Sequence, residues 1–151
     1  MKKMKDPMDD DVFGTSKLQK VGASWPINSK LASSALSNKK MKVLEKNIKG
    51  KVHFLGAGVV NGHQGVKLKA VMEVSKLGIP LPQMFKVASS KLVVGLDGFF
   101  PNDIMIDSPR SRRTMNMEFV AVGNRGPKAP PMKMSIQVKF DLNTTRKYLK
   151  K

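Results

Sequence analysis

The stretch from Met132 to Leu142 carries an apolar side chain at every second position without a break. Successive side chains on a β-strand point to opposite faces of the sheet, so this alternation predicts a strand with one apolar and one polar face. The polar face would be basic, because Lys133 and Lys139 outnumber Asp141. We expect this stretch to be the central strand of a sheet, with its apolar face in the core. That face would consist of Met132, Met134, Ile136, Val138, Phe140 and Leu142.

Other stretches with a period of two or a short apolar run predict further strands. They are found at 52–55, 66–75, 91–96 and 114–122. Asn61-Gly62 favours a two-residue hairpin turn between the first two of these strands, and residues 83–90 would form one or two helical turns. Strands spaced in this way, with little helix between them, indicate a mainly β fold. We expect an antiparallel sandwich or partly open barrel with at most one or two short helices.

The first third of the chain differs from the rest in composition. Residues 1–51 carry 12 lysines and five acidic residues among few large apolar groups, which is little apolar surface to offset the entropy of ordering. We therefore expect residues 1–50 to be a flexible basic arm and residues 51–151 to be a compact β-rich domain. Within the arm, residues 31–48 have apolar positions that fit a short basic helix.

The charge of the chain indicates its class of partner. A formal net charge of +17 arises from 28 Lys and Arg against 11 Asp and Glu, which produces a strong positive field. Nucleic acid and an anionic membrane surface are the two common partners of such a field, and charge alone does not separate them. No apolar run resembles a secretory signal or a membrane span, so we expect a protein that stays inside the cell.

The sequence contains no pattern typical of an active site. The chain has no cysteine, which excludes disulfides, thiolate metal sites and cysteine nucleophiles. Gly56-Ala57-Gly58 departs from the dinucleotide-binding motif, because Asn61 stands where its last Gly or Ala belongs. His53 and His63 are the only histidines, and two ligands do not make a zinc site. We expect no enzymatic activity, no cofactor and no metal.

Basic residues in loops and tails are the candidate polyanion-binding groups. Arg110, Arg112 and Arg113 would lie in a loop at 107–113, where guanidinium groups can bind phosphates in a bidentate manner. The remaining candidates lie in the next loop and at the two ends of the chain. They are Arg125, Lys128, Arg146, Lys147, Lys150, Lys151, Lys2, Lys3 and Lys5.

A small apolar cluster in the arm, Trp25-Pro26-Ile27, includes the only Trp of the chain. An apolar cluster in a polar segment has two interpretations. It would attach the arm either to the body of the same chain or to a second copy, and we take Trp25, Pro26 and Ile27 as the candidate self-association residues.

The layout of the chain resembles that of small virus-encoded structural proteins, in particular the matrix proteins of negative-strand RNA viruses. The similar features are a lysine-rich start with the acidic patch Asp9-Asp10-Asp11, a Met-rich β body, loops with proline and no cysteine. Ala129-Pro-Pro-Met132 lacks the tyrosine of the Pro-Pro-x-Tyr budding motif of some family members. The resemblance implies self-association, attachment to anionic membrane and contact with a ribonucleoprotein, in the virion and the host cell interior.

Two functions follow from these observations. The first is a non-enzymatic, matrix-like viral structural protein that binds polyanions and forms homo-oligomers. The alternative is a nucleic-acid-binding viral coat or movement protein, or another RNA-binding protein, whose basic residues neutralise phosphates directly.

Overall fold

The computed structural model describes residues 12–15, 17–102 and 110–145. One antiparallel sheet dominates this part of the chain, together with one short α-helix and one 3₁₀ turn. In chain order the elements are β1 (Ser24–Pro26), α1 (Ser29–Leu36), the 3₁₀ turn η2 (Glu45–Asn47), β2 (Ile48–Val60), β3 (His63–Ser75), β4 (Phe85–Pro101), β5 (Arg110–Gly123) and β6 (Met132–Thr145).

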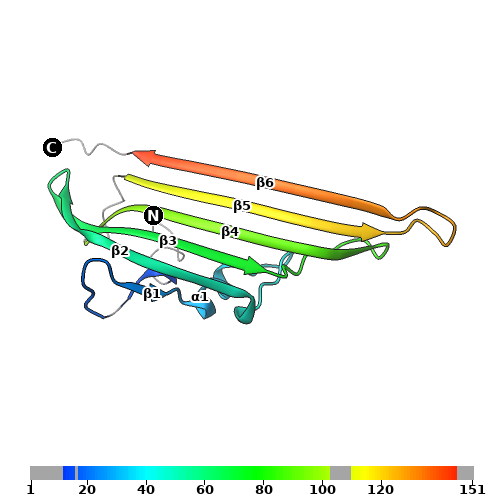
Figure 1. The fold of residues 1–151 in the computed structure, drawn as a ribbon, viewed down its shortest axis with the longest axis horizontal. Helices are drawn as coiled ribbons and strands as arrows, with labels where there is room; N and C mark the ends of the chain where they lie inside the picture. Colours follow the sequence, from blue (N-terminus) through cyan, green and yellow to red (C-terminus); the bar gives the residue numbers. More distant parts are fainter. Residues whose placement is uncertain (1–11, 16, 103–109, 146–151) are drawn as a thin grey trace.

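The strands follow one another across the sheet in chain order, from β1 at one edge to β6 at the other (Figure 1). Each neighbouring pair is antiparallel. The predicted turn joins β2 to β3, with Asn61 at φ 52° and Gly62 at φ 81°, both in the left-handed region that such a turn requires. The mainly β, antiparallel prediction is confirmed. The sheet is open, and a helix with its flanking segment covers one face where a sandwich would have a second sheet.

The covering layer comes from the segment that the sequence assigned to a flexible arm. Val12, Phe13, Ile27, Ala32 and Val43 are buried against the apolar face of β2, β3 and β4. The boundary expected at residue 50 falls inside β2, so the separation of the described residues 12–50 from the body is wrong. The sequence does not reveal this packing, because these apolar residues are separated by polar stretches and follow neither the period of a strand nor that of a helix. The first eleven residues lie outside the described part.

The alternating stretch from Met132 to Leu142 is a strand, as expected, but it is not central. It forms β6, which has a neighbour on one side only. Its apolar side chains point to the same face as the core, yet Ile136 and Val138 are each 43% exposed and Phe140 is 52% exposed. The covering layer is too short to reach them: among the described residues, none of β6 belongs to the core cluster.

Two local expectations also need correction. Residues 85–90 belong to β4 and pair with β5, so the helical turns expected there do not form; a bulge between Val87 and Ser89 accommodates the irregular pattern. The expected helix at 31–48 is shorter and begins earlier, as α1. The Asn28 side chain accepts a hydrogen bond from the Leu31 backbone N–H at 3.1 Å and thus caps its N-terminus.

Candidate polyanion interface

The sheet has one face that the helical layer does not cover, and we call it the open face. Side chains on neighbouring strands share a face when their residues are register partners. One such row runs from His53 on β2 through Lys69, Asp97 and Arg112 to Asn143 on β6. Row after row, lysines and arginines of β2 to β6 therefore point to the same side.

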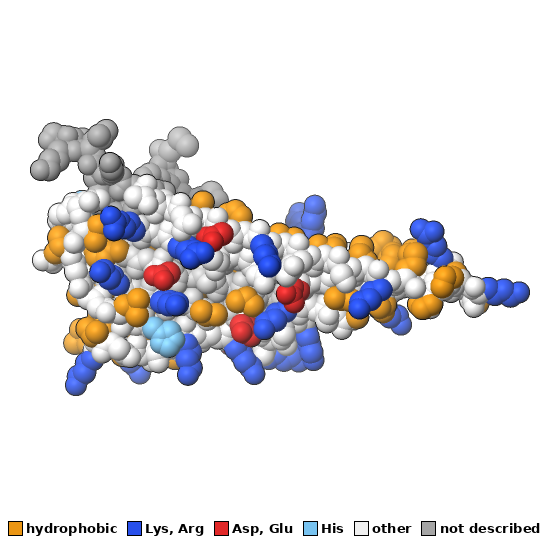
Figure 2. All heavy atoms as spheres, turned by 45° about the horizontal axis from the view of Figure 1, so that its top comes forward, with side chains coloured by type: hydrophobic (Ala, Val, Ile, Leu, Met, Phe, Trp, Pro, Cys, Tyr) orange, Lys and Arg blue, Asp and Glu red, His pale blue; other side chains and the backbone are white. Residues whose placement is uncertain are grey.

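The open face carries a surplus of positive charge. Within the described strands it presents ten Lys and Arg and four Asp and Glu, and all of them are exposed. Figure 2 views this face and shows basic side chains spread along it with a few acidic ones between them. The basic residues are Lys49, Lys51, Lys67, Lys69, Lys86, Lys91, Arg110, Arg112, Lys133 and Lys139, and the acidic ones are Glu73, Asp97, Glu118 and Asp141.

Two of the four acidic groups form ion pairs with neighbours on the same face. Arg112 binds Asp141 in a bidentate manner, with Nε at 3.1 Å from Oδ1 and Nη2 at 2.6 Å from Oδ2. The hydrogen bonds from Arg112 lower the pKa of the Asp141 carboxyl below its ordinary value. Lys91 Nζ lies 3.3 Å from a Glu73 carboxylate oxygen. These pairs neutralise local charge, and β2 and β3 keep Lys49, Lys51, Lys67 and Lys69 as a basic cluster.

The three predicted arginines lie on a strand, which corrects their placement in a loop. β5 begins at Arg110, so all three fall within it. Because side chains alternate on a strand, Arg110 and Arg112 point to the open face and Arg113 points to the covered face. The register partners of Arg113 are Leu96 on β4 and Leu142 on β6. The structure thus brings two of the three together with the lysines and separates the third.

The other predicted site residues have mixed outcomes. Arg125 and Lys128 are exposed in the connection between β5 and β6, as expected for a loop. Ile27 is buried in the core and Trp25 packs against it, with the indole N–H donating to the Phe13 carbonyl at 3.0 Å. This cluster therefore attaches the N-terminal segment to the body of the same chain, and only Pro26 is exposed. The following candidates lie outside the described residues: Lys2, Lys3, Lys5, Arg146, Lys147, Lys150 and Lys151.

Sequence reasoning missed the lysines of β2 and β3, although a signal for them was present. Lys67 and Lys69 alternate with the apolar residues Val66, Leu68 and Ala70 of β3. In the same way, Lys133 and Lys139 lie at polar positions between the apolar residues of β6. Alternation within one strand indicates which of its sides is apolar, but it does not show which residues of other strands share the polar side. The register sets Lys51 opposite Val71, so that Lys51 and Lys69 are diagonal neighbours on the same face, and a single strand does not contain this pairing.

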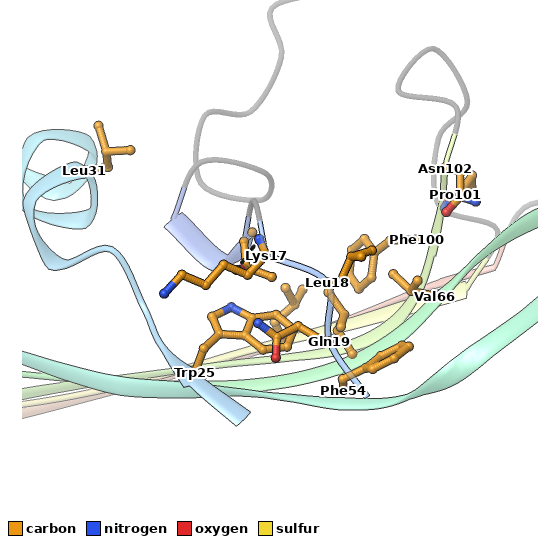
Figure 3. Close-up of a pocket in the computed structure, with 14 residues that line it drawn as sticks. Lys17, Leu18, Gln19, Trp25, Leu31, Phe54, Val66, Phe100, Pro101 and Asn102 are labelled. Carbon is orange, nitrogen blue, oxygen red and sulfur yellow. Dashed lines mark hydrogen bonds between the residues drawn. The ribbon is translucent and has the colours of Figure 1, made fainter. Parts of the chain in front are cut away.

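A hollow of about 680 Å³ lies on the covered side of the sheet. Figure 3 shows the rings of Trp25, Phe54 and Phe100 around it, next to the segment that carries Lys17 and Leu18. Lys17 is the one charged residue among the described residues that line it. The lining thus offers no acid and base pair for catalysis.

The remaining polar candidates do not converge. His53 lies in the middle of β2 and His63 at the start of β3, where it pairs with Val60. Their register positions are about six or seven residues apart, which corresponds to roughly 20 Å along the strands. Within the described residues no group of three His, Cys, Asp or Glu side chains is arranged to hold a metal ion.

The chain has no significant match among protein-family models, curated protein sequences or solved structures. In the part of the chain that the structure describes, no helix combines the length and apolar character needed to cross a membrane. The open face and its charges are therefore the features of the described residues that indicate a function.

Proposed function

We propose that this chain is a non-enzymatic, matrix-like viral structural protein that binds polyanions through the open face of its sheet and associates with copies of itself. The observation that carries the proposal is the surplus of exposed Lys and Arg on one side of β2 to β6. Its partners would be a ribonucleoprotein and an anionic membrane surface, and it would act in the virion and in the host cell interior.

The shape and chemistry of the open face favour contact with phosphates. The face is a broad sheet surface with lysines and arginines distributed over five strands, which suits an extended polymer or a lipid surface better than a small molecule. Val71 and Val93 share the open face with the lysines, and the ring of Phe99 is buried. Exposed rings for stacking on bases are thus scarce, so we expect weak sequence preference.

The viral assignment comes from the layout of the chain. The Met-rich β body, the loops with proline and the absence of cysteine support it. The resemblance loses one feature, because residues 12–50 pack on the sheet and do not extend as an arm. The alternative, a nucleic-acid-binding coat or movement protein or another RNA-binding protein, shares the open face and differs in the expected partner.

Co-sedimentation of the purified chain with anionic liposomes and with single-stranded RNA, across a salt series, tests the proposal. A matrix-like protein binds both at low salt, and binding weakens steeply as salt rises. A protein of the alternative class binds RNA and stays in the supernatant when neutral or anionic liposomes are pelleted. Binding to neither polyanion at low salt would contradict both functions.

A matched pair of triple variants locates the contact. Replacing Lys51, Lys67 and Lys69 with Gln removes three charges from the open face. Each lost contact with single-stranded RNA lowers the slope of log K against log salt by roughly 0.7, so the slope should fall by about two. The control replaces three exposed lysines of the covering layer and should leave the slope unchanged. Those lysines are Lys30, Lys39 and Lys46.

If the control variant loses as much affinity and slope as the open-face variant, the contact is not confined to the open face. Net charge alone would then explain the binding, because both variants lose three positive charges.

A further inference from the structure

β6 is a long edge strand with an unpaired side. Among the described residues, its fourteen residues pair with β5 on one side only, so every second backbone N–H and C=O points away from β5 and has no partner strand in the described sheet. Such an edge is a template for pairing with another strand. The apolar side chains of β6 extend the core face beyond the covering layer, and Val138 and Phe140 remain about half exposed.

The sequence of β6 is complementary to itself in one antiparallel register. With Gln137 opposite Gln137 of a second copy, residues 132–142 all find partners. The apolar residues then face apolar residues: Ile136 lies opposite Val138, Met134 opposite Phe140, and Met132 opposite Leu142. Such cross-strand pairs are the unit of sheet stabilisation.

The charges of β6 fit the same register. Lys133 of each copy lies opposite Asp141 of the other, and Lys139 lies opposite Ser135, so no like charges face each other. Asp141 has an intramolecular partner in Arg112, but its side chain is still 45% exposed and can accept a second cation. Because the register is symmetric, the ion pair between Lys133 and Asp141 forms twice in one dimer.

We propose that two copies of this chain pair antiparallel through β6, in the register centred on Gln137, and join their sheets into one. A two-fold axis perpendicular to the sheet keeps the open faces of both copies on the same side, so their lysines form one larger basic surface. The inference rests on the self-association part of the proposed function and supplies its surface. It does not depend on polyanion binding.

The oligomeric state of the full chain at high salt, without any polyanion, tests this pairing. Val138→Lys places a charge against Ile136 of the second copy and should weaken dimerisation at least about tenfold. The matched control is Val71→Lys, since Val71 is a valine of similar exposure, 40% against 43%, on the open face of a central strand. Sedimentation equilibrium over a concentration series gives the dimer dissociation constant of the unchanged chain and of each variant.

Dimerisation of the unchanged chain and of Val71→Lys, with a weakened Val138→Lys variant, would support the proposal. A chain that remains monomeric up to about 100 µM would overturn it, as would equal dimerisation of both variants. Neither result bears on whether the open face binds RNA, which is measured at low salt on the same chain.

The register is tested by cross-linking, because the chain has no cysteine of its own. In the proposed register a Gln137→Cys thiol lies opposite its copy, with Cα atoms about 4.5–5.5 Å apart. Two Lys133→Cys thiols are eight residues apart, or about 27 Å along the strand. A short bis-maleimide should thus link Gln137→Cys into a covalent dimer and leave Lys133→Cys uncoupled. The reverse result would overturn the register.

Discussion

At the scale of single residues, the end of β3 near the hairpin has no room for a side chain at Gly65. A Cβ added there would lie 2.7 Å from Cζ of Phe99 and 2.8 Å from Cα of Pro101, well inside contact distance. Gly65→Ala should therefore destabilise the fold by about 1–3 kcal/mol, the usual cost of overpacking. Chemical denaturation measures this as a lower midpoint with an unchanged slope.

Gly58, the cross-strand partner of Gly65, provides the control. A Cβ added at Gly58 meets nothing within 4 Å. Gly58→Ala should leave the stability unchanged or raise it by up to about 1 kcal/mol, because alanine reduces the entropy of the unfolded chain. Equal effects of the two substitutions would contradict the close packing of β3 against β4.

The ion pair between Arg112 and Asp141 makes a pH-dependent contribution at the surface. Hydrogen bonds from Arg112 hold the pKa of Asp141 below its ordinary value in the folded state. The pair therefore stabilises the fold above the unfolded-state pKa of the carboxyl, and this contribution is lost as pH falls through the lowered folded-state pKa. The stability difference between the unchanged chain and Asp141→Asn should shrink over that range.

An NMR titration of the Asp141 carboxyl tests the cause directly. The Arg112→Gln substitution removes the hydrogen bonds and the positive charge, so the pKa of Asp141 should rise toward its ordinary value. A pKa that stays low in Arg112→Gln would show that another group is responsible.

At the scale of elements, the covering layer is an integral part of the fold. Phe13 is 3% exposed and belongs to the core cluster. Phe13→Ala should destabilise the chain by about 3–5 kcal/mol, as is usual for removal of a buried ring. Thermal or chemical denaturation measures the loss.

Leu18 is the control for this layer, because it is in the same segment and fully exposed. Leu18→Ala should change the stability by less than about 0.5 kcal/mol. A Phe13→Ala variant as stable as the unchanged chain would mean that residues 12–50 are an arm after all.

The alternation of apolar and polar residues predicted from the sequence that a strand forms, but it did not predict where that strand lies in the sheet. The alternation in Met132–Leu142 identified β6 and its two faces correctly. It could not reveal that β6 is an edge strand, because an apolar face has the same pattern whether or not a layer covers it. The segment that contains Phe13 has few apolar residues, and its place in the core likewise depends on contacts that exist only in the folded sheet.

For the molecule as a whole, the net charge predicts a negatively charged partner, and the sequence alone indicates only part of the basic open face. A net charge of +17 indicates a polyanion. The basic residues of the loops and tails stand out in the sequence itself, because they lie in short segments with few apolar residues. The cluster of Lys51, Lys67 and Lys69 becomes visible only when strands are placed side by side, since register brings together residues that are distant in the chain.

Lysine footprinting identifies the lysines that contact a bound polyanion and thus tests whether the open face is the binding surface. The full chain is acylated at low salt with and without excess single-stranded RNA, and the rate at each lysine is measured by mass spectrometry. We predict strong protection of Lys49, Lys51, Lys67 and Lys69, and unchanged rates at Lys30 and Lys46 on the covering layer. Protection of lysines on the covering layer, with unchanged rates at the lysines of β2 and β3, would mean that RNA does not bind on the open face.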